Sequence, residues 1–171
     1  NIIVNKQVEI IGSNAVVNGG GDAAFEIREE NVKISGFNMS TNTSFVGGAL
    51  EIYSSDNVEI LNNNIETVSN VIGIWICGSN NACSRVNNLD IINNNIKING
   101  VSTGIYADFS SPAHTSWLIQ DNKIDSAGVN LELYDVKNVD VNNNTFYGNG
   151  NSVSVVYASE FSNISNADFL D

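Results

Sequence analysis

A twelve-residue stretch, Asn57 to Val68 (NVEILNNNIETV), recurs in recognisable form along the whole chain. Each copy places an apolar residue before a polar triplet and a second apolar residue five positions after the first. Successive copies are about 22 to about 31 residues apart, a period typical of solenoid repeats rather than of unrelated strands. The first apolar residue of each copy is Ile10, Ile34, Ile60, Ile91, Ile119, Val141 or Ile164. This repeat predicts a stack of similar coils, each one turn of a solenoid.

Within each repeat, apolar and polar residues alternate over short segments, as expected of strands with one buried face. The copy that starts at Val58 continues through Ile65 to the apolar segment 73–76. Helix formers are scarce, whereas Asn, Ser, Gly, Ile and Val abound. We therefore expect an all-β solenoid of about seven coils with three short strands per coil, as a single module over residues 1–171.

The polar triplet between the first two strands of each coil is rich in asparagine. A tight bend needs a residue that tolerates the left-handed region, and Asn is the best choice after Gly. Asn side chains stacked in successive coils can also pass amide hydrogen bonds along the solenoid. We favour this structural ladder over a metal-binding or ice-binding row. Its predicted members are Asn63, Asn94, Asn122 and Asn144.

Charge limits the partners of this chain. The formal net charge is −12 with seven Lys plus Arg, which disfavours nucleic acids and anionic membranes. No apolar run approaches the ~20 residues of a transmembrane helix, so we expect no membrane insertion. The strand expected at Ile2–Val4 would be an uncovered edge, which predicts flanking coils or a cap from a longer chain.

Two cysteines, Cys77 and Cys83, lie six residues apart in the polar stretch ICGSNNACS. This separation suits a local disulfide that closes a loop, and two free surface thiols are the alternative.

The repeats NVEILNNNI, NLDIINNNI and NVDVNNNTF resemble those of right-handed parallel β-helix proteins, the pectin-lyase-like superfamily. The opening VNKQVEIIGSNAVVNGGG, followed by FEIREENVKISGF, is similar to the start of their carbohydrate-binding and sugar-hydrolase module, which periplasmic copper-enzyme maturation proteins share. The resemblance spans nearly the whole chain. It implies a right-handed parallel β-helix in an extracellular, periplasmic or cell-surface protein. It selects no activity, because the superfamily includes lyases, hydrolases, epimerases, adhesins and phage spikes.

In such folds the strand after the longer loop lines the usual binding groove. The outward residues of that strand form one column of Glu26, Glu51, Trp75, Tyr106, Glu132 and Ser154, and a second of Arg28, Tyr53, Cys77, Asp108, Tyr134 and Val156. Aromatic rings beside carboxylates suit a sugar, which needs an apolar face to stack on and acceptors for its hydroxyls. Alternatively, these rings only cover neighbouring strands. The predicted substrate-binding residues are Glu51, Tyr53, Trp75, Tyr106, Tyr134 and His114.

His114 joins this set because of the loops. The two longest excursions, 77–86 and 108–116, directly follow the strands of Trp75 and Tyr106, and long loops on a repeat scaffold usually form one wall of a site. His114 is the only histidine and lies in the second loop, where a lone histidine is most often merely solvated.

One carboxylate pair could support catalysis. Asp108 and Glu132 are expected on neighbouring coils two residues out of register, roughly 7 to 8 Å apart, and inverting glycoside hydrolysis needs ~6.5 to 9.5 Å. The paired aspartates and the His and Arg motifs of polygalacturonases are absent, and the lyase-type base has only Arg28 nearby. One His and one Met offer few ligands for copper. Glu26 above Glu51 would place like charges together, which a bound calcium ion would offset.

The predicted function is therefore recognition of an extracellular polysaccharide or surface glycan. A structural or adhesive stalk is the first alternative. A glycoside hydrolase, or another polysaccharide-degrading enzyme that uses Asp108 and Glu132, is the second.

Overall fold

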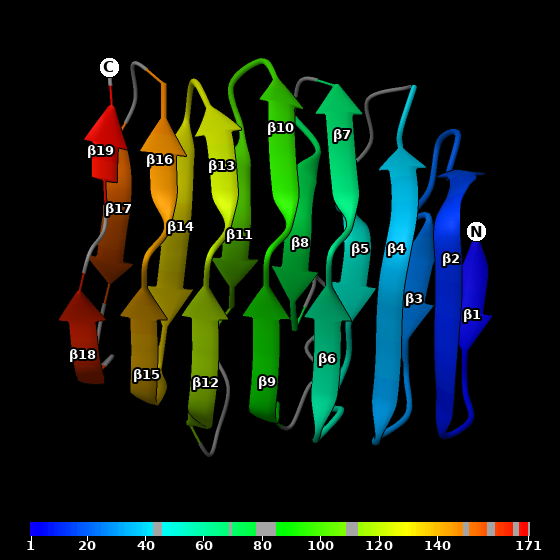
Figure 1. Cartoon of the computed structure of the whole chain (residues 1–171), viewed down its shortest axis with the longest axis horizontal. Helices are drawn as coiled ribbons and strands as arrows, with labels where there is room; N and C mark the ends of the chain where they lie inside the picture. Colours follow the sequence, from blue (N-terminus) through cyan, green and yellow to red (C-terminus); the bar gives the residue numbers. More distant parts are fainter. Residues whose placement is uncertain are drawn as a thin grey trace.

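The computed structural model describes residues 1–42, 46–68, 70–77, 85–108, 113–148, 151–156, 160–165 and 168–170, with side chains as far as residue 148. Every regular element in these ranges is a strand, and every strand pairing is parallel. Figure 1 shows the coils side by side along the long axis, from β1 and β2 at the N-terminal end to β18 and β19 at the C-terminal end. The chain is thus an all-β parallel β-solenoid of about five turns.

One layer of the solenoid is a seven-stranded sheet, to which each coil, including the incomplete coils at the two ends, contributes one strand. Its order along the axis is β1 (Ile2–Val4), β3 (Phe25–Ile27), β5 (Gly48–Ile52), β8 (Ile72–Ile76), β11 (Thr103–Ala107), β14 (Val129–Tyr134) and β17 (Asn151–Val156).

The other layer is a twelve-stranded sheet. Its first row of strands is β6 (Val58–Leu61), β9 (Asn87–Ile92), β12 (His114–Gln120), β15 (Val136–Asn142) and β18 (Glu160–Ser165). Its second row is β7 (Asn64–Val68), β10 (Asn95–Asn99), β13 (Lys123–Ser126), β16 (Thr145–Tyr147) and β19 (Asp168–Leu170). The long strand β4 (Val32–Ser40) pairs with both β6 and β7 and so joins the two rows, and β2 (Val8–Asn18) pairs with β4.

The expected three strands per coil and seven coils are corrected by this arrangement. The first two segments of a coil belong to one sheet, because in β2 and β4 they run on as a single strand. The sequence therefore predicted three faces where the structure has two sheets. The larger coil number arose because the sequence pattern also counts the incomplete coils at both ends.

The core consists of stacked apolar side chains from successive coils. Ile34, Ile60, Ile91 and Ile119 are paired in register between neighbouring strands, and each is fully buried. Each such side chain contributes roughly 1.5 to 3 kcal/mol before the cost in conformational entropy. The predicted apolar anchors of the repeat are therefore core residues, as the sequence indicated.

The predicted asparagine ladder is present, and we call its four residues, Asn63, Asn94, Asn122 and Asn144, the inner ladder. All four are at most 2% exposed. The main-chain N and Nδ2 of Asn63 donate to Oδ1 of Asn94 at 2.9 and 3.1 Å. Asn94 donates in the same way to Asn122, and Asn122 to Asn144. The ladder therefore satisfies main-chain groups at the bends with side-chain amides of neighbouring coils.

A second row lies one residue earlier in each bend and faces solvent; we call it the outer row, formed by Asn62, Asn93, Asp121 and Asn143. Their φ angles are 57, 55, 56 and 53°, in the left-handed region. Gly36, with φ of 73°, occupies the equivalent place in β4. The requirement for a left-handed residue, predicted from the sequence, is thus met by the first member of the triplet.

Candidate functional site

The candidate site is the outward face of the seven-stranded sheet. Strand register pairs Glu26 with Glu51, Glu51 with Trp75, Trp75 with Tyr106, and Tyr106 with Glu132. Glu132 is in turn paired with Ser154. The first predicted column is therefore one continuous line across six neighbouring strands, because the repeat keeps its phase from coil to coil.

Three aromatic rings lie side by side in the C-terminal half of this face. Tyr106 contacts Trp75 at a centroid distance of 6.3 Å and Tyr134 at 5.7 Å, both with edge-to-face geometry. Tyr106 and Tyr134 are half-buried. Burial raises the pKa of Tyr106 to about 12, so its hydroxyl stays protonated at neutral pH. The pair offers neutral, partly open aromatic surface.

Trp75 differs from the expectation of an open stacking platform. Its side chain points outward, yet the residue is only 6% exposed. Tyr106 lies against one side, and Gly48 on the preceding strand leaves no room for a Cβ, which would come within 2.7 Å of the Trp75 Cβ. Nε1 of Trp75 is buried and has no hydrogen-bond partner among the residues that the structure describes. Trp75 thus forms the floor beneath its neighbours rather than a platform.

The N-terminal half of the face is occupied by an arginine. Arg28 Nε donates to Glu26 at 2.9 Å, and the two side chains form an ion pair. The guanidinium of Arg28 also lies 5.1 Å from the centroid of the Tyr53 ring. Hydrogen bonding to Glu26 raises the pKa of Arg28. One cation therefore serves a carboxylate and an aromatic ring at once.

Glu51 is held by neutral donors. Its carboxylate accepts hydrogen bonds from the main-chain N of Gly48, at 2.9 Å, and from the Tyr53 hydroxyl. Burial raises the pKa of Glu51, and these two hydrogen bonds lower it in part. Burial also raises the pKa of Tyr53, and the hydrogen bond to Glu51 adds to the effect.

These contacts bear on the calcium site predicted at Glu26 and Glu51, which stays a prediction. Glu26 and Glu51 are adjacent, but Arg28 neutralises one and hydrogen bonds satisfy the other. Among the residues whose placement is described, no group of three or more His, Cys, Asp and Glu could hold a metal ion.

The predicted catalytic pair lies at the C-terminal half. Glu132 accepts hydrogen bonds from the Tyr134 hydroxyl at 3.0 Å and from Thr103 Oγ1 at 3.4 Å. Asp108 follows β11, two residues beyond Tyr106, the register partner of Glu132. Both acids are partly exposed. The register places them on neighbouring strands as expected, and their catalytic role stays a prediction.

His114 is not a solvated loop residue, which corrects the sequence interpretation. It begins β12, is completely buried and packs against Trp117 at 5.1 Å. Its Nδ1 accepts from the main-chain N of Val86 at 2.9 Å, so Nε2 carries the proton and donates to the main-chain O of Asp108 at 3.0 Å. Burial lowers its pKa, which favours this neutral form. His114 therefore links the main chain of Val86 to that of Asp108 and is not exposed to solvent.

Two further predictions depend on residues outside the described ranges. Cys77 is buried at the end of β8 with φ of 62°, whereas Cys83 is outside the described part of the chain, and their pairing stays a prediction. Most of the two long loops, residues 78–84 and 109–112, is also outside it.

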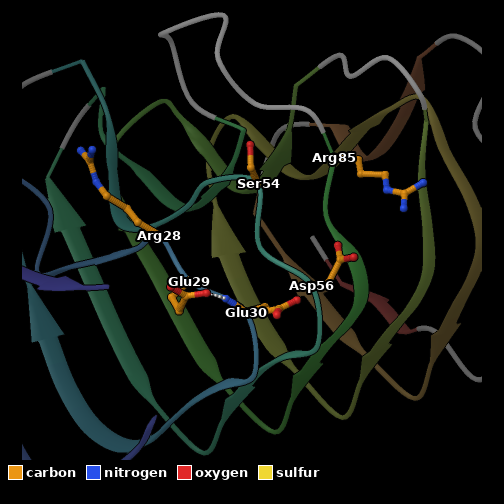
Figure 2. Close-up of a pocket in the computed structure, with 6 residues that line it drawn as sticks. All are labelled: Arg28, Glu29, Glu30, Ser54, Asp56 and Arg85. Carbon is orange, nitrogen blue, oxygen red and sulfur yellow. Dashed lines mark hydrogen bonds between the residues drawn. The ribbon is translucent and has the colours of Figure 1, made fainter. Parts of the chain in front are cut away.

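A shallow polar depression lies where the chain leaves the seven-stranded sheet. Figure 2 shows Arg28 and Arg85 at its two ends, with the acidic side chains between them. Asp56 is already engaged, since it accepts from the main-chain N and Nδ2 of Asn87 at 2.9 and 3.1 Å. The sequence did not predict this depression because its residues belong to turns. In turns, no alternation of apolar and polar residues indicates where the side chains point. Its lining residues are Arg28, Glu29, Glu30, Ser54, Asp56 and Arg85.

The fold defines the chain as a parallel β-solenoid protein with an asparagine ladder. No protein-family model matches it, and neither a curated protein sequence nor a solved structure gives a significant match. Within the described ranges, no helix is long and apolar enough to cross a membrane.

Proposed function

We propose that the outward face of the seven-stranded sheet binds an extracellular polysaccharide. The observation that carries the proposal is the line of three aromatic rings, Trp75, Tyr106 and Tyr134, beside the carboxylate of Glu132. Sugar rings stack on aromatic faces and donate hydroxyl hydrogen bonds to carboxylates. A sheet of parallel strands repeats these groups at ~4.8 Å intervals, which suits an extended polymer better than a small compact ligand.

Within this proposal the side chains have distinct roles. Tyr106 and Tyr134 provide the stacking surface, and Trp75 supports Tyr106 from the neighbouring strand. Glu132 and Asp108 accept sugar hydroxyls in the same half of the face. Tyr53 and Glu51 extend the surface toward the N-terminal end.

A structural or adhesive stalk remains the second candidate because one observation favours it. The acidic side chains are satisfied within their own strands: Glu51 by Tyr53, and Glu132 by Tyr134. Such contacts stabilise a sheet surface whether or not a ligand is present.

The hydrolase alternative is tested by product analysis. If Asp108 and Glu132 act as an inverting pair, Asp108→Asn and Glu132→Gln should each abolish release of reducing sugar from a bound glycan. Hydrolysis that survives both changes excludes this pair as the catalysts.

The proposal includes a finer class for the fold: a right-handed parallel β-helix of the pectin-lyase type, located outside the cytoplasm or on the cell surface. Parallel strands joined by crossovers are right-handed in about 98% of cases, which supports that hand. The repeats NVEILNNNI and NLDIINNNI support the superfamily.

A glycan array on the unmodified chain, followed by calorimetry, tests the function. Tyr106→Ala should weaken binding of the selected glycan by ~1 kcal/mol or more, because it removes the central stacking ring. Tyr147→Ala is the matched control, since Tyr147 is a half-buried tyrosine on the twelve-stranded sheet, beneath the Lys123 ammonium. If no glycan binds, or if both variants bind as the wild type does, the stalk interpretation replaces this proposal.

A further inference from the structure

The two halves of the candidate face share a tyrosine–glutamate pair, but the neighbouring strand differs: Glu26 and Arg28 in the N-terminal half stand where Tyr106 and Asp108 stand in the C-terminal half. Directly after β5 the Tyr53 hydroxyl donates to Glu51 two residues earlier, and in β14 the Tyr134 hydroxyl donates to Glu132 two residues earlier. Beside the first pair lies Arg28, whose guanidinium is 5.1 Å from the Tyr53 ring and bonded to Glu26. The N-terminal half therefore contains its own cation.

The C-terminal half has the ring and the carboxylate without that cation. No strand of the seven-stranded sheet carries Lys or Arg, and Arg28 directly follows β3 at the other end. All seven basic residues of the chain belong to the described part, and none forms an ion pair with Glu132 there. The hydrogen-bond donors to Glu132, Tyr134 and Thr103, are neutral. Its negative charge is thus solvated but not paired.

The neighbouring rings determine what kind of cation fits. Tyr106 and Tyr134 stand 5.7 Å apart at an angle of 61°, and the Tyr134 hydroxyl is bonded to Glu132, so a cation beside Glu132 lies next to aromatic rings, as Arg28 lies next to Tyr53. An ammonium group gains from both contacts.

We propose that the C-terminal half of this face binds the protonated amino group of an amino-sugar polymer, with Glu132 as its counter-ion and Tyr106 and Tyr134 as its aromatic wall. This rests on the proposed function, since it names the substrate class of the same face. The acidic balance of the chain, −12, favours such a ligand over an uronic-acid polymer through long-range attraction.

The first experiment compares three six-unit oligosaccharides by calorimetry: one of glucosamine, its fully N-acetylated counterpart with the same linkage, and one of galacturonic acid. The glucosamine oligomer should bind about tenfold more tightly than the acetylated one, because acetylation removes the charge that Glu132 recognises. Glu132→Gln should remove that advantage. Glu59→Gln on the twelve-stranded sheet, an exposed acid as well, should leave it unchanged.

The second experiment uses Arg28, which occupies the equivalent place in the N-terminal half. Arg28→Ala removes the cation from Glu26 and from the Tyr53 ring. These groups lie four and three strands of ~4.8 Å spacing from Glu132, within reach of the same oligomer. The variant should bind the glucosamine oligomer about threefold or more tightly, with no gain for the acetylated one. Weaker binding would overturn the inference, because Arg28 would then be a ligand contact and not a substitute for one.

The outcomes separate the two proposals. If the acetylated or the galacturonic oligomer binds as tightly as the glucosamine oligomer, the amino-sugar assignment is refuted, but polysaccharide recognition is not. Absence of binding for every glycan on the array refutes both. A hexalysine peptide that binds as tightly as the glucosamine oligomer also overturns the assignment, because the site would then recognise ammonium groups of any source.

Discussion

The inner ladder and the outer row are sequence neighbours in every bend, yet they do different physical work. Asn63 and Asn94 of the inner ladder are buried and donate hydrogen bonds to main-chain and side-chain oxygens of neighbouring coils. Asn62 and Asn93 of the outer row are exposed, and their main structural contribution is a backbone at φ near 55°. Identical residues one position apart therefore differ in what they stabilise: the first supplies hydrogen bonds, and the second supplies a conformation.

The largest effect should come from breaking the inner ladder. Asn94→Ala removes the acceptor of the Asn63 main-chain N and the donor to the main-chain O of Ile60, and both groups are buried. Unsatisfied buried groups cost about 1–3 kcal/mol each, so we expect a loss of about 3 kcal/mol in the free energy of unfolding. Urea unfolding measures it. A loss below that of Asn93→Ala would contradict the assignment of the ladder as the stronger element.

His114 is buried as the inner-ladder amides are, but it can titrate, so its effect on stability should depend on pH. Burial lowers the pKa of His114, so the unfolded chain takes up the proton first. The contribution of His114 to the free energy of unfolding should therefore be fully present above the ordinary histidine pKa of ~6.5. It should fall as the pH drops below that value, by up to about 1.4 kcal/mol per pH unit. The amides of the inner ladder contribute no such slope.

The matched variant for that prediction is His114→Gln, which keeps a polar side chain but cannot titrate. Urea unfolding of both proteins between pH 7.5 and pH 5 isolates the contribution of His114 from that of the carboxylates. An unchanged difference between the two proteins across this range would show that the pKa of His114 is the same in the folded and the unfolded chain.

A smaller effect is expected in the outer row. Asn93→Ala keeps the fold but places a less tolerant residue at φ of 55°, at a cost of about 1 kcal/mol. Asn93→Gly should be nearly neutral, because glycine adopts this conformation freely and Gly36 already does so in β4. If the glycine variant loses as much as the alanine variant, the hydrogen bond from Asn93 to Asn62 matters and not the conformation.

The smallest effect belongs to the third residue of the bend. Asn95 is exposed, and its Nδ2 donates to Asn64 in the preceding coil at 2.6 Å. Since water can replace this partner, Asn95→Ala should change the free energy of unfolding by less than about 0.5 kcal/mol. A thermal melt alongside Asn94→Ala gives the contrast directly, and comparable losses would mean that burial does not distinguish the two positions.

Strand phase was predictable because the repeat itself encodes it. The column from Glu26 through Glu51 to Trp75 follows from the alternation in three coils, and the register reproduces it. The alternation of apolar and polar residues predicts which side of the sheet a side chain points to, but not how exposed that side chain is. Trp75 points outward as predicted and is nevertheless covered, since a large ring beside Tyr106 loses its solvent contact to its neighbour.

His114 shows what a longer comparison between repeats could have revealed. Val86, His114 and Val136 each stand three residues before an inward apolar residue, with a left-handed residue between. That intervening residue, Ser116 in β12, shifts the alternation, so His114 faces the core as Val136 does. Its place in a loop with the only proline concealed this equivalence. The loops themselves have no repeat partner, which is why sequence periodicity gave no conformation for them.

The inner ladder also has a direction along the solenoid. Asn63 donates to Asn94, Asn94 to Asn122, and Asn122 to Asn144, so the amide dipoles are aligned in series and each polarises the next. A coil that docks on the C-terminal side must bring an oxygen atom, whereas one on the N-terminal side must bring an N–H group, as the main chain of Phe37 does. The two growth ends are thus chemically unlike. During synthesis the N-terminus emerges first, so each finished coil presents oriented N–H donors to the coil that follows it. The ladder therefore favours the addition of coils from the N-terminus to the C-terminus.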